Sequence, residues 1–266
     1  MTRRLDSTVA ARGLARSRTH AASLIAAGAV VVDGAVVTRP AHPVSDSHRI
    51  RVLAEVDFVS RGAGKLTAAL DAFGVSVSGR VALDAGASTG GFTQVLRRRG
   101  AEPVIAVDVG HDQLAPAVAA DAGVIRLDGV NVRTLTGPAL RELTGVTAAP
   151  DLVTADLSFI SLRTVMPALT GLAAAGADLI LLVKPQFEVG RAAIGAGVVT
   201  DPRRRAAAVT GVLEEAWRRG AGTLGVMRSP VVGTHGNVEY LAHLGVGRGS
   251  GPTEWEPVVA EAAGAR

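Results

Sequence analysis

The stretch Val81-Ala-Leu-Asp-Ala-Gly-Ala-Ser-Thr-Gly-Gly-Phe92 decides the fold that the sequence predicts. It begins with a short apolar run that is typical of a buried strand, and Asp84 stands where this strand ends. A glycine-rich turn follows, and the segment from Phe92 to Arg99 has helical character. Strand, glycine turn and helix start are together typical of a nucleotide-type cofactor site, because glycines let a ligand approach backbone N–H groups closely.

Strands and helices alternate from Ser60 onward, which predicts a mostly parallel, seven-stranded sheet with helices on both faces, a Rossmann-like α/β fold. One helix is predicted after Asp201-Pro202, with Asp as the cap and Pro in the first turn. The last strand follows the previous one through a loop too short for a crossover helix, so we expect it to be antiparallel. The predicted strands are Val81–Asp84, Val104–Val109, Val124–Leu127, Leu152–Ala155, Leu179–Val183, Thr223–Met227 and Val238–Leu244.

The segment before Ser60 is predicted to be a separate, small α+β unit. It contains two short helical segments broken at Gly13 and Gly28, with Ser17 as the cap of the second. An Asp33-Gly34 pair between valine-rich runs predicts a hairpin with a two-residue turn. The expected division is 1–55 for the small domain, 56–59 for a linker, 60–245 for the large domain and 246–266 for a loose tail rich in Gly, Ala and Glu.

Positive charge is concentrated in the small domain. Residues 1–55 hold eight arginines and four acidic residues, which accounts for the whole net charge of +4. A basic module attached to a neutral body predicts binding of a polyanion such as RNA, and an ordinary solvated surface is the alternative.

Several other classes of protein fit the sequence less well. The basic N-terminus and the apolar run Ala21–Val32 resemble a secretory signal, but Gly28 and the Asp-Gly hairpin interrupt the run and Asp6 lies in its basic part. No run reaches the roughly 18 apolar residues that a membrane helix needs. The absence of cysteine excludes disulfides, thiolate metal sites and cysteine nucleophiles, and fits a reducing cytosol.

The glycine turn predicts S-adenosylmethionine (SAM) in preference to NAD. Its glycine spacing differs from the G-x-G-x-x-G of dinucleotide sites, and an acid before the first glycine repels a pyrophosphate but suits an ammonium and a sulfonium. The next two strands also end in acids, which can bind the ribose hydroxyls and the adenine amino group. The candidate cofactor-binding residues are Asp84, Gly86, Ala87, Ser88, Thr89, Gly90, Gly91, Phe92, Asp108, Asp128 and Asn131.

Lysine is rare in this chain, since 26 of the 28 basic residues are arginine and only Lys65 and Lys184 are lysine. Lys184 and Asp156 follow two parallel strands and are expected at the same sheet edge, with Lys65 on the first helix and Glu239 on the last strand. Two lysines and two carboxylates above a methyl donor can orient a ribose 2′-hydroxyl and take or stabilise its proton. A pair of buried salt bridges is the structural alternative.

Two other methylation chemistries fit worse. Amino methylation of bases typically uses an Asp/Asn-Pro-Pro-aromatic loop after the fourth strand, where this chain has Asp156-Leu-Ser-Phe159. Methylation of cytosine at C5 needs a cysteine nucleophile.

Longer motifs carry a family resemblance. Residues 60–244 resemble the FtsJ/RrmJ-type RNA ribose 2′-O-methyltransferases, whose Lys-Asp-Lys-Glu tetrad corresponds to the two lysines and two acids above. Residues 5–53 resemble an S4-like RNA-binding domain through Arg12-Gly-Leu-Ala-Arg-Ser-Arg18 and the Asp-Gly hairpin. Together with Ala155-Asp-Leu-Ser-Phe-Ile-Ser161 and Val183-Lys-Pro-Gln-Phe-Glu188, these motifs make the chain similar to the TlyA (hemolysin A) family.

That resemblance implies a SAM-dependent enzyme that methylates cytidine 2′-hydroxyls in 16S and 23S ribosomal RNA, an activity linked to capreomycin and viomycin susceptibility. It implies ribosomal RNA or ribosomal subunits as partners, and we expect a cytoplasmic monomer without a metal. The alternatives are a non-catalytic RNA-binding assembly factor and a membrane-active hemolysin. The candidate RNA-binding residues are Arg3, Arg4, Arg12, Arg16, Arg18, Arg49 and Arg61.

Overall fold

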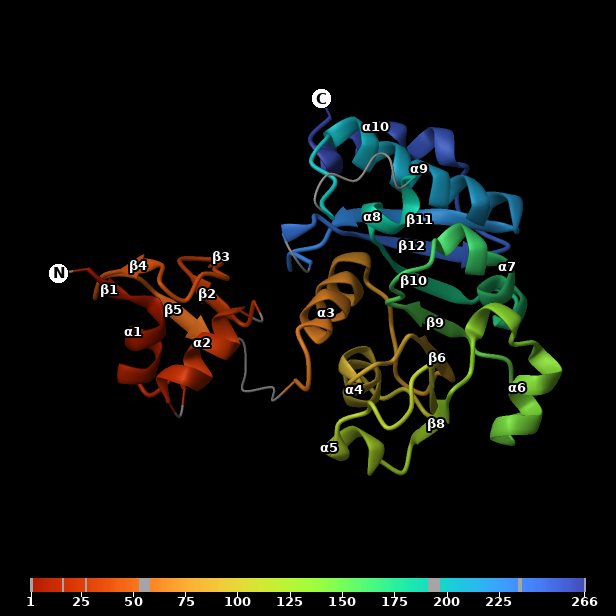
Figure 1. The fold of residues 1–266 in the computed structure, drawn as a ribbon, viewed down its shortest axis with the longest axis horizontal. Helices are drawn as coiled ribbons and strands as arrows, with labels where there is room; N and C mark the ends of the chain where they lie inside the picture. Colours follow the sequence, from red (N-terminus) through yellow and green to blue (C-terminus); the bar gives the residue numbers. More distant parts are fainter. Residues whose placement is uncertain are drawn as a thin grey trace.

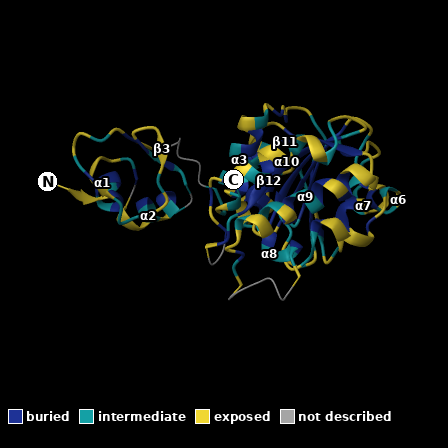
Figure 2. Cartoon of the chain, turned by 90° about the horizontal axis from the view of Figure 1, so that it is seen from above, coloured by how far each residue is buried: buried dark blue, intermediate teal, exposed yellow. Residues whose placement is uncertain are grey.

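The computed structural model describes residues 2–15, 17–26, 28–52, 58–190, 197–233 and 236–265. Within these ranges the chain has a small N-terminal α+β part and a larger part built around one sheet (Figure 1). In both parts the buried residues gather in the interior, and the outer faces of the helices carry the exposed ones (Figure 2).

The larger part contains a seven-stranded sheet with the order β11-β12-β10-β9-β6-β7-β8. The five strands from β10 to β8 run parallel, and β12 is antiparallel to both of its neighbours. This confirms the mostly parallel sheet and the antiparallel last strand. The strands are β6 (Ala82–Ala85), β7 (Val104–Asp108), β8 (Val124–Asp128), β9 (Leu152–Ala155), β10 (Asp178–Val183), β11 (Ala221–Arg228) and β12 (Tyr240–Val246).

Helices cover both faces of this sheet (Figure 1). The central strand β10 shows why, because its apolar residues alternate between two cores. Leu179 and Leu181 join the core under α7 and α9, whereas Ile180 and Leu182 join the core under α3 and α4. The helices are α3 (Gly62–Phe73), α4 (Gly91–Arg98), α5 (Pro116–Ala119), α6 (Gly137–Thr144), α7 (Leu162–Leu172), α8 (Pro185–Glu188), α9 (Pro202–Arg218) and α10 (Glu256–Ala263), with 3-10 turns η1 (Val132–Thr134) and η4 (Pro252–Trp255).

The cap of α9 and the C-terminal tail were both predicted from the sequence, and the structure agrees with the first prediction only. The carboxylate of Asp201 accepts a hydrogen bond from the N–H of Arg203 at 2.8 Å, which is the expected cap of α9. The loose tail predicted for 246–266 is wrong, because η4 and α10 form there and α10 buries Val259 and Ala263 in the core beside α9. Packing against α9 stabilises a short helix that its own composition does not predict.

The N-terminal part has its own small core, formed mainly by Leu5, Val9, Leu24 and Ile25. The hairpin is confirmed, with positive φ angles of 50° at Asp33 and 89° at the glycine after it. The second helix is capped as predicted, since the hydroxyl of Ser17 accepts from the N–H of His20 at 3.0 Å. The elements are β1 (Arg3–Arg4), α1 (Leu5–Ala11), α2 (Arg18–Ala26), β2 (Val30–Val32), β3 (Ala35–Val36), β4 (Pro43–Val44) and β5 (Ile50–Val52).

Asp84, near the end of β6, ties three elements of the large domain together. Its side chain is fully buried and accepts hydrogen bonds from the hydroxyls of Thr93 on α4, at 2.6 Å, and Thr154 on β9, at 3.0 Å. Burial disfavours the charged form and raises the pKa of this carboxyl to about 6. The two threonine hydroxyls oppose that shift because they stabilise the carboxylate.

This pKa predicts a pH dependence of stability. The folded-state pKa lies above the unfolded value of roughly 3.9, so the contribution of Asp84 is fully present below the unfolded pKa and is lost as pH rises through the folded one. The free energy of unfolding of the wild type, relative to Asp84→Asn, should therefore fall by about 2 kcal/mol between about pH 4 and about pH 7.

Urea unfolding at a series of pH values measures this difference. Asp71→Asn is the control, because Asp71 is an exposed acid paired with Arg99 on the surface, and its difference from the wild type should vary much less with pH. A pH-independent difference for Asp84→Asn would show that Asp84 keeps an ordinary pKa.

Candidate active site

Two cavities meet above the carboxyl ends of the parallel strands. The smaller has a volume of about 250 Å³ and the larger about 510 Å³. Gly86, Ser88, Asp156 and Ser158 line both. A ligand in one cavity therefore lies next to a ligand in the other across these four residues.

The glycine turn permits this arrangement because the loop after β9 lies directly on it. Gly86 has a φ of 83°, and a Cβ added there would lie 2.8 Å from the carbonyl oxygen of Asp156. Both the backbone conformation and the close approach require glycine. The residue at the first position of the turn thus brings Asp156 to the junction of the two cavities.

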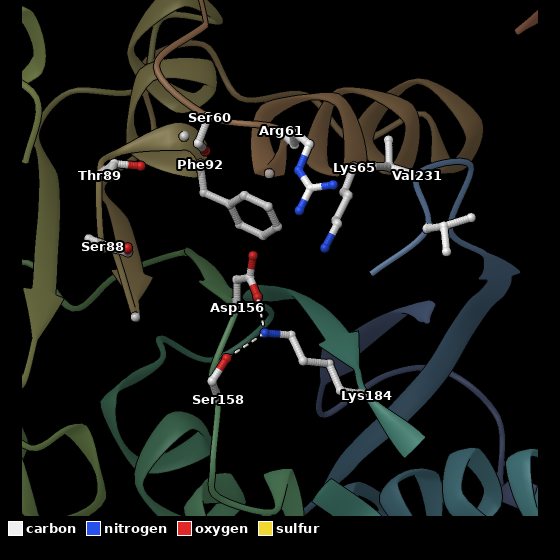
Figure 3. A pocket seen from close by; sticks show the side chains of 15 residues that line it. Ser60, Arg61, Lys65, Ser88, Thr89, Phe92, Asp156, Ser158, Lys184 and Val231 are labelled. Atoms are coloured by element: carbon white, nitrogen blue, oxygen red, sulfur yellow. Dashed lines mark hydrogen bonds and ion pairs between the residues drawn. The ribbon is translucent and has the colours of Figure 1, made fainter. Parts of the chain in front are cut away.

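Lys184 and Asp156 form one charged pair at this junction (Figure 3). The ammonium of Lys184 lies 2.6 Å from Oδ1 of Asp156 and donates a hydrogen bond of 2.8 Å to the hydroxyl of Ser158. Lys184 directly follows β10 and is 9% exposed, so its charge is held largely out of water. Ion pairing offsets the cost of that desolvation.

Lys65 and Glu239 form the second pair, on the other side of the smaller cavity. The ammonium of Lys65, on α3, donates to Oε2 of Glu239 at 2.5 Å, and both side chains are buried. Glu239 directly precedes β12, and a Cβ on Gly233 would lie 2.2 Å from its Oε1. Glycine at that position leaves room for the carboxylate. Lys65, Asp156 and Lys184 line the smaller cavity, with Glu239 behind Lys65.

The walls of the larger cavity fit SAM. Asp108 accepts hydrogen bonds from the N–H groups of Ser88 and Gly110, each at 2.8 Å, which fixes a carboxylate beside the glycine turn. Asn131 adds a polar group. The rest of the wall is mainly apolar and suits an adenine ring; it includes Val109, Val130, Val132, Leu157 and Ile160.

The candidate cofactor residues fall into three groups. Gly86, Ser88, Asp108 and Asn131 line the larger cavity, and Ala87, Thr89, Gly91 and Phe92 line the smaller one. Asp84, Gly90 and Asp128 line neither. The carboxylate of Asp128 instead accepts from the N–H of Asp112 at 2.9 Å and pairs with Arg126.

Sequence reasoning missed Ser158, Gln113 and the aromatic pair at the rim. Gln113 donates to Asp108 at 3.1 Å inside the larger cavity. Phe159 is 91% exposed with a φ of 65°, and its ring lies 5.3 Å from that of Phe187. The aromatic residue in Asp156-Leu-Ser-Phe159 was the available signal, because loops after the carboxyl ends of parallel strands line the ligand crevice.

The candidate RNA-binding arginines differ in whether their side chains already form ion pairs or hydrogen bonds within the protein. Arg4 and Arg18 pair with the buried Asp6, which lowers the pKa of that carboxyl. Arg12 donates to the carbonyls of Ser45, Asp46 and His48.

Three further candidates reach solvent without such partners in the described part of the chain. Arg3, Arg49 and Arg61 are exposed and form no ion pair with any residue that the structure describes. Arg61 lines the smaller cavity. Arg16 lies outside the described residues. The described helices include none that is long and apolar enough to cross a membrane.

Comparisons with known proteins agree with this arrangement. Residues 58–246 match the family of FtsJ-like methyltransferases, and residues 3–50 match the S4 domain. A protein of Mycobacterium tuberculosis H37Rv named 16S/23S rRNA (cytidine-2′-O)-methyltransferase TlyA is 50% identical over 244 residues, 91% of this chain and 89% of its own. Hemolysin A of Brachyspira hyodysenteriae is 34% identical over 91% of this chain and 99% of its own.

A solved structure from Streptococcus thermophilus superposes with a TM-score of 0.72 at 36% identity, covering 98% of this chain and 95% of that one. Both the sequence matches and this superposition extend over the small and the large part together. The chain belongs to the TlyA family of FtsJ-like, SAM-dependent methyltransferases with an S4 domain.

Proposed function

We propose that this chain transfers a methyl group from SAM to the 2′-hydroxyl of a cytidine in 16S and 23S ribosomal RNA. Both lysines of the chain line the cavity next to the one that fits SAM, and each is paired with a carboxylate, which supports the proposal. The name of the Mycobacterium tuberculosis relative supports the substrate.

The roles of the four residues follow from their positions. When bound, SAM supplies a methyl group made electrophilic by the sulfonium. Lys184, at the junction of the cavities, activates the 2′-hydroxyl: once its ammonium has given up a proton to solvent, the amine accepts the hydroxyl proton as the oxygen–methyl bond forms and the sulfur–methyl bond breaks. Asp156 holds the lysine and stabilises the charge that it gains. Lys65, fixed by Glu239, donates a hydrogen bond that orients the ribose.

A cytidine whose base is still stacked in folded RNA cannot place its ribose in this cavity, so we expect the nucleotide to flip out of its stack. The exposed ring of Phe159 and its neighbour Phe187 lie at the rim beside Lys184. Aromatic faces of this kind stabilise an unstacked base by stacking.

The small domain is proposed to bind folded ribosomal RNA through its exposed arginines, which contact phosphates and position the substrate without specifying it. We assign residues 1–55 to this domain and 60–245 to the methyltransferase domain. The chain is proposed to act as a monomer on ribosomal subunits in the cytoplasm, and the charge of the N-terminal arginines supports that choice of partner.

Lys184→Ala and Lys184→Arg test the mechanism. Both variants should lose at least about 100-fold in methyl transfer, because the arginine keeps a charge but cannot accept a proton near neutral pH. Transfer of tritiated methyl to purified 16S and 23S RNA and to 30S and 50S subunits measures this, and calorimetry should show nearly normal SAM binding.

Arg219→Ala is the matched control. Arg219 follows α9 and pairs with Glu215 at the end of the sheet opposite the cavities, so this variant should keep full activity. Wild-type transfer by either Lys184 variant would remove Lys184 from the mechanism. RNA binding without any transfer by the wild type would favour the assembly-factor alternative.

Substitution of Arg49 should mainly change RNA binding, whereas substitution of Arg12 should mainly change stability. Arg49→Ala removes an exposed cation that forms no ion pair with any described residue, so it should weaken RNA binding and reduce the slope of log affinity against log salt by about 0.7 to 0.9. Arg12→Ala removes three hydrogen bonds to the turn before β5 and should mainly lower the thermal stability of the small domain. Titration of both variants with rRNA at several salt concentrations, beside thermal unfolding, separates the two effects. Equal salt slopes for Arg49→Ala and the wild type would contradict the role of Arg49.

A further inference from the structure

Ser158 lies beside Lys184 but has no role in the reaction proposed above. It lies two residues after Asp156, in the loop between β9 and α7, and it lines both cavities. Its hydroxyl accepts a hydrogen bond of 2.8 Å from Nζ of Lys184 (Figure 3). Ser158 is therefore the neutral partner of the lysine at the junction.

The two partners of Lys184 act on it differently. Oδ1 of Asp156 lies 2.6 Å from Nζ, yet this buried oxygen accepts no hydrogen bond from any residue that the structure describes, so the contact is an ion pair without hydrogen-bond alignment. Coulomb attraction depends on distance and leaves the ammonium free to rotate, whereas a hydrogen bond is directional. The hydroxyl of Ser158 thus fixes which way the remaining N–H or lone pair of Lys184 points.

The loop that carries Ser158 is held at both ends. At its start, the N–H of Asp156 donates to the carbonyl of Ala85 at 3.1 Å. At its end, the carboxylate of Glu188 accepts from the hydroxyl of Ser161 at 2.5 Å and from the N–H of Leu162 at 2.7 Å. Because Glu188 lies in the short helix directly after Lys184, the same contacts link the serine loop to the lysine.

Lys65 provides the contrast within the same site. Its ammonium makes an aligned hydrogen bond to the carboxylate of Glu239, and it donates to no hydroxyl among the residues that the structure describes. One lysine is thus oriented by its carboxylate, while the other needs a second group for orientation.

We propose that Ser158 is a positioning residue that aims Lys184 at the substrate hydroxyl. The proposal rests on the proposed function, because it names what orients the group that acts on the ribose. Ser158 itself takes no proton in this account; it sets the rotation of the lysine amine, so that the position not used by Ser158 or Asp156 faces the smaller cavity.

The lysine content of the chain allows a test that does not depend on activity. Protein labelled with [¹⁵N]lysine should give two Nζ resonances, one from each lysine, and Lys184→Arg assigns them. In Ser158→Ala the Lys184 resonance should shift and its protons should exchange with water roughly five- to tenfold faster, while the Lys65 resonance stays unchanged. Ser158→Thr, which keeps the hydroxyl, should restore the wild-type spectrum.

Kinetics test the consequence for the reaction. Ser158→Ala should lower kcat roughly 10- to 100-fold with little change in KM for RNA, since a small misalignment affects the transition state more than binding. Ser158→Thr should recover most of that loss. In the Lys184→Ala background, Ser158→Ala should cause no further loss, because the two residues act as a unit.

Ser76→Ala is the control, an exposed serine in the segment between α3 and β6 that should match the wild type in both measurements. An unchanged Lys184 resonance or an unchanged kcat in Ser158→Ala overturns the proposal. If the wild type methylates no ribosomal RNA, the proposed function fails, and the lysine spectrum alone then decides whether Ser158 orients Lys184.

Discussion

The approach of the loop after β9 to the glycine turn is the contact on which the rest of the site depends. Strands β6 and β9 are parallel neighbours, with Ala85 paired to Ala155, so their carboxyl ends reach the same edge together. The chain can place Asp156 there only because Gly86 has no side chain to meet its carbonyl. With that loop on the turn, the larger cavity, which fits SAM, and the smaller cavity, which both lysines line, share a wall.

Charge burial explains why the lysines stay where the chemistry needs them. A buried ammonium without a partner is costly, so each lysine is stable at its position only while its carboxylate is present. Different elements supply the two pairs: α3 and the start of β12 for one, and the ends of β10 and β9 for the other. The fold of the large domain therefore determines the geometry of the four residues, because it places each carboxylate beside its lysine.

Much of this was predictable from the sequence. Apolar runs predicted the strands, and the short connection before Tyr240 predicted that the last strand is antiparallel. The rarity of lysine indicated Lys65 and Lys184 as candidate site residues. The orientation of an acid at a strand end was not predictable, because it depends on neighbours distant in sequence. Asp84 turns toward Thr93 and Thr154, and Asp128 toward Arg126. The apolar wall of the larger cavity carries no motif, and α10 depends on its packing against α9.

The chemical identity of the methylated nucleoside shows directly whether these four residues act on a ribose hydroxyl. Ribosomal RNA labelled by the wild-type protein with tritiated SAM is digested to nucleosides, and the radioactive product is identified by chromatography and mass spectrometry. A site built from two lysine–carboxylate pairs predicts a 2′-O-methylated nucleoside, and the proposed substrate makes that nucleoside 2′-O-methylcytidine. Label in a base-methylated nucleoside such as 5-methylcytidine would contradict the assignment of these four residues to an alcohol acceptor.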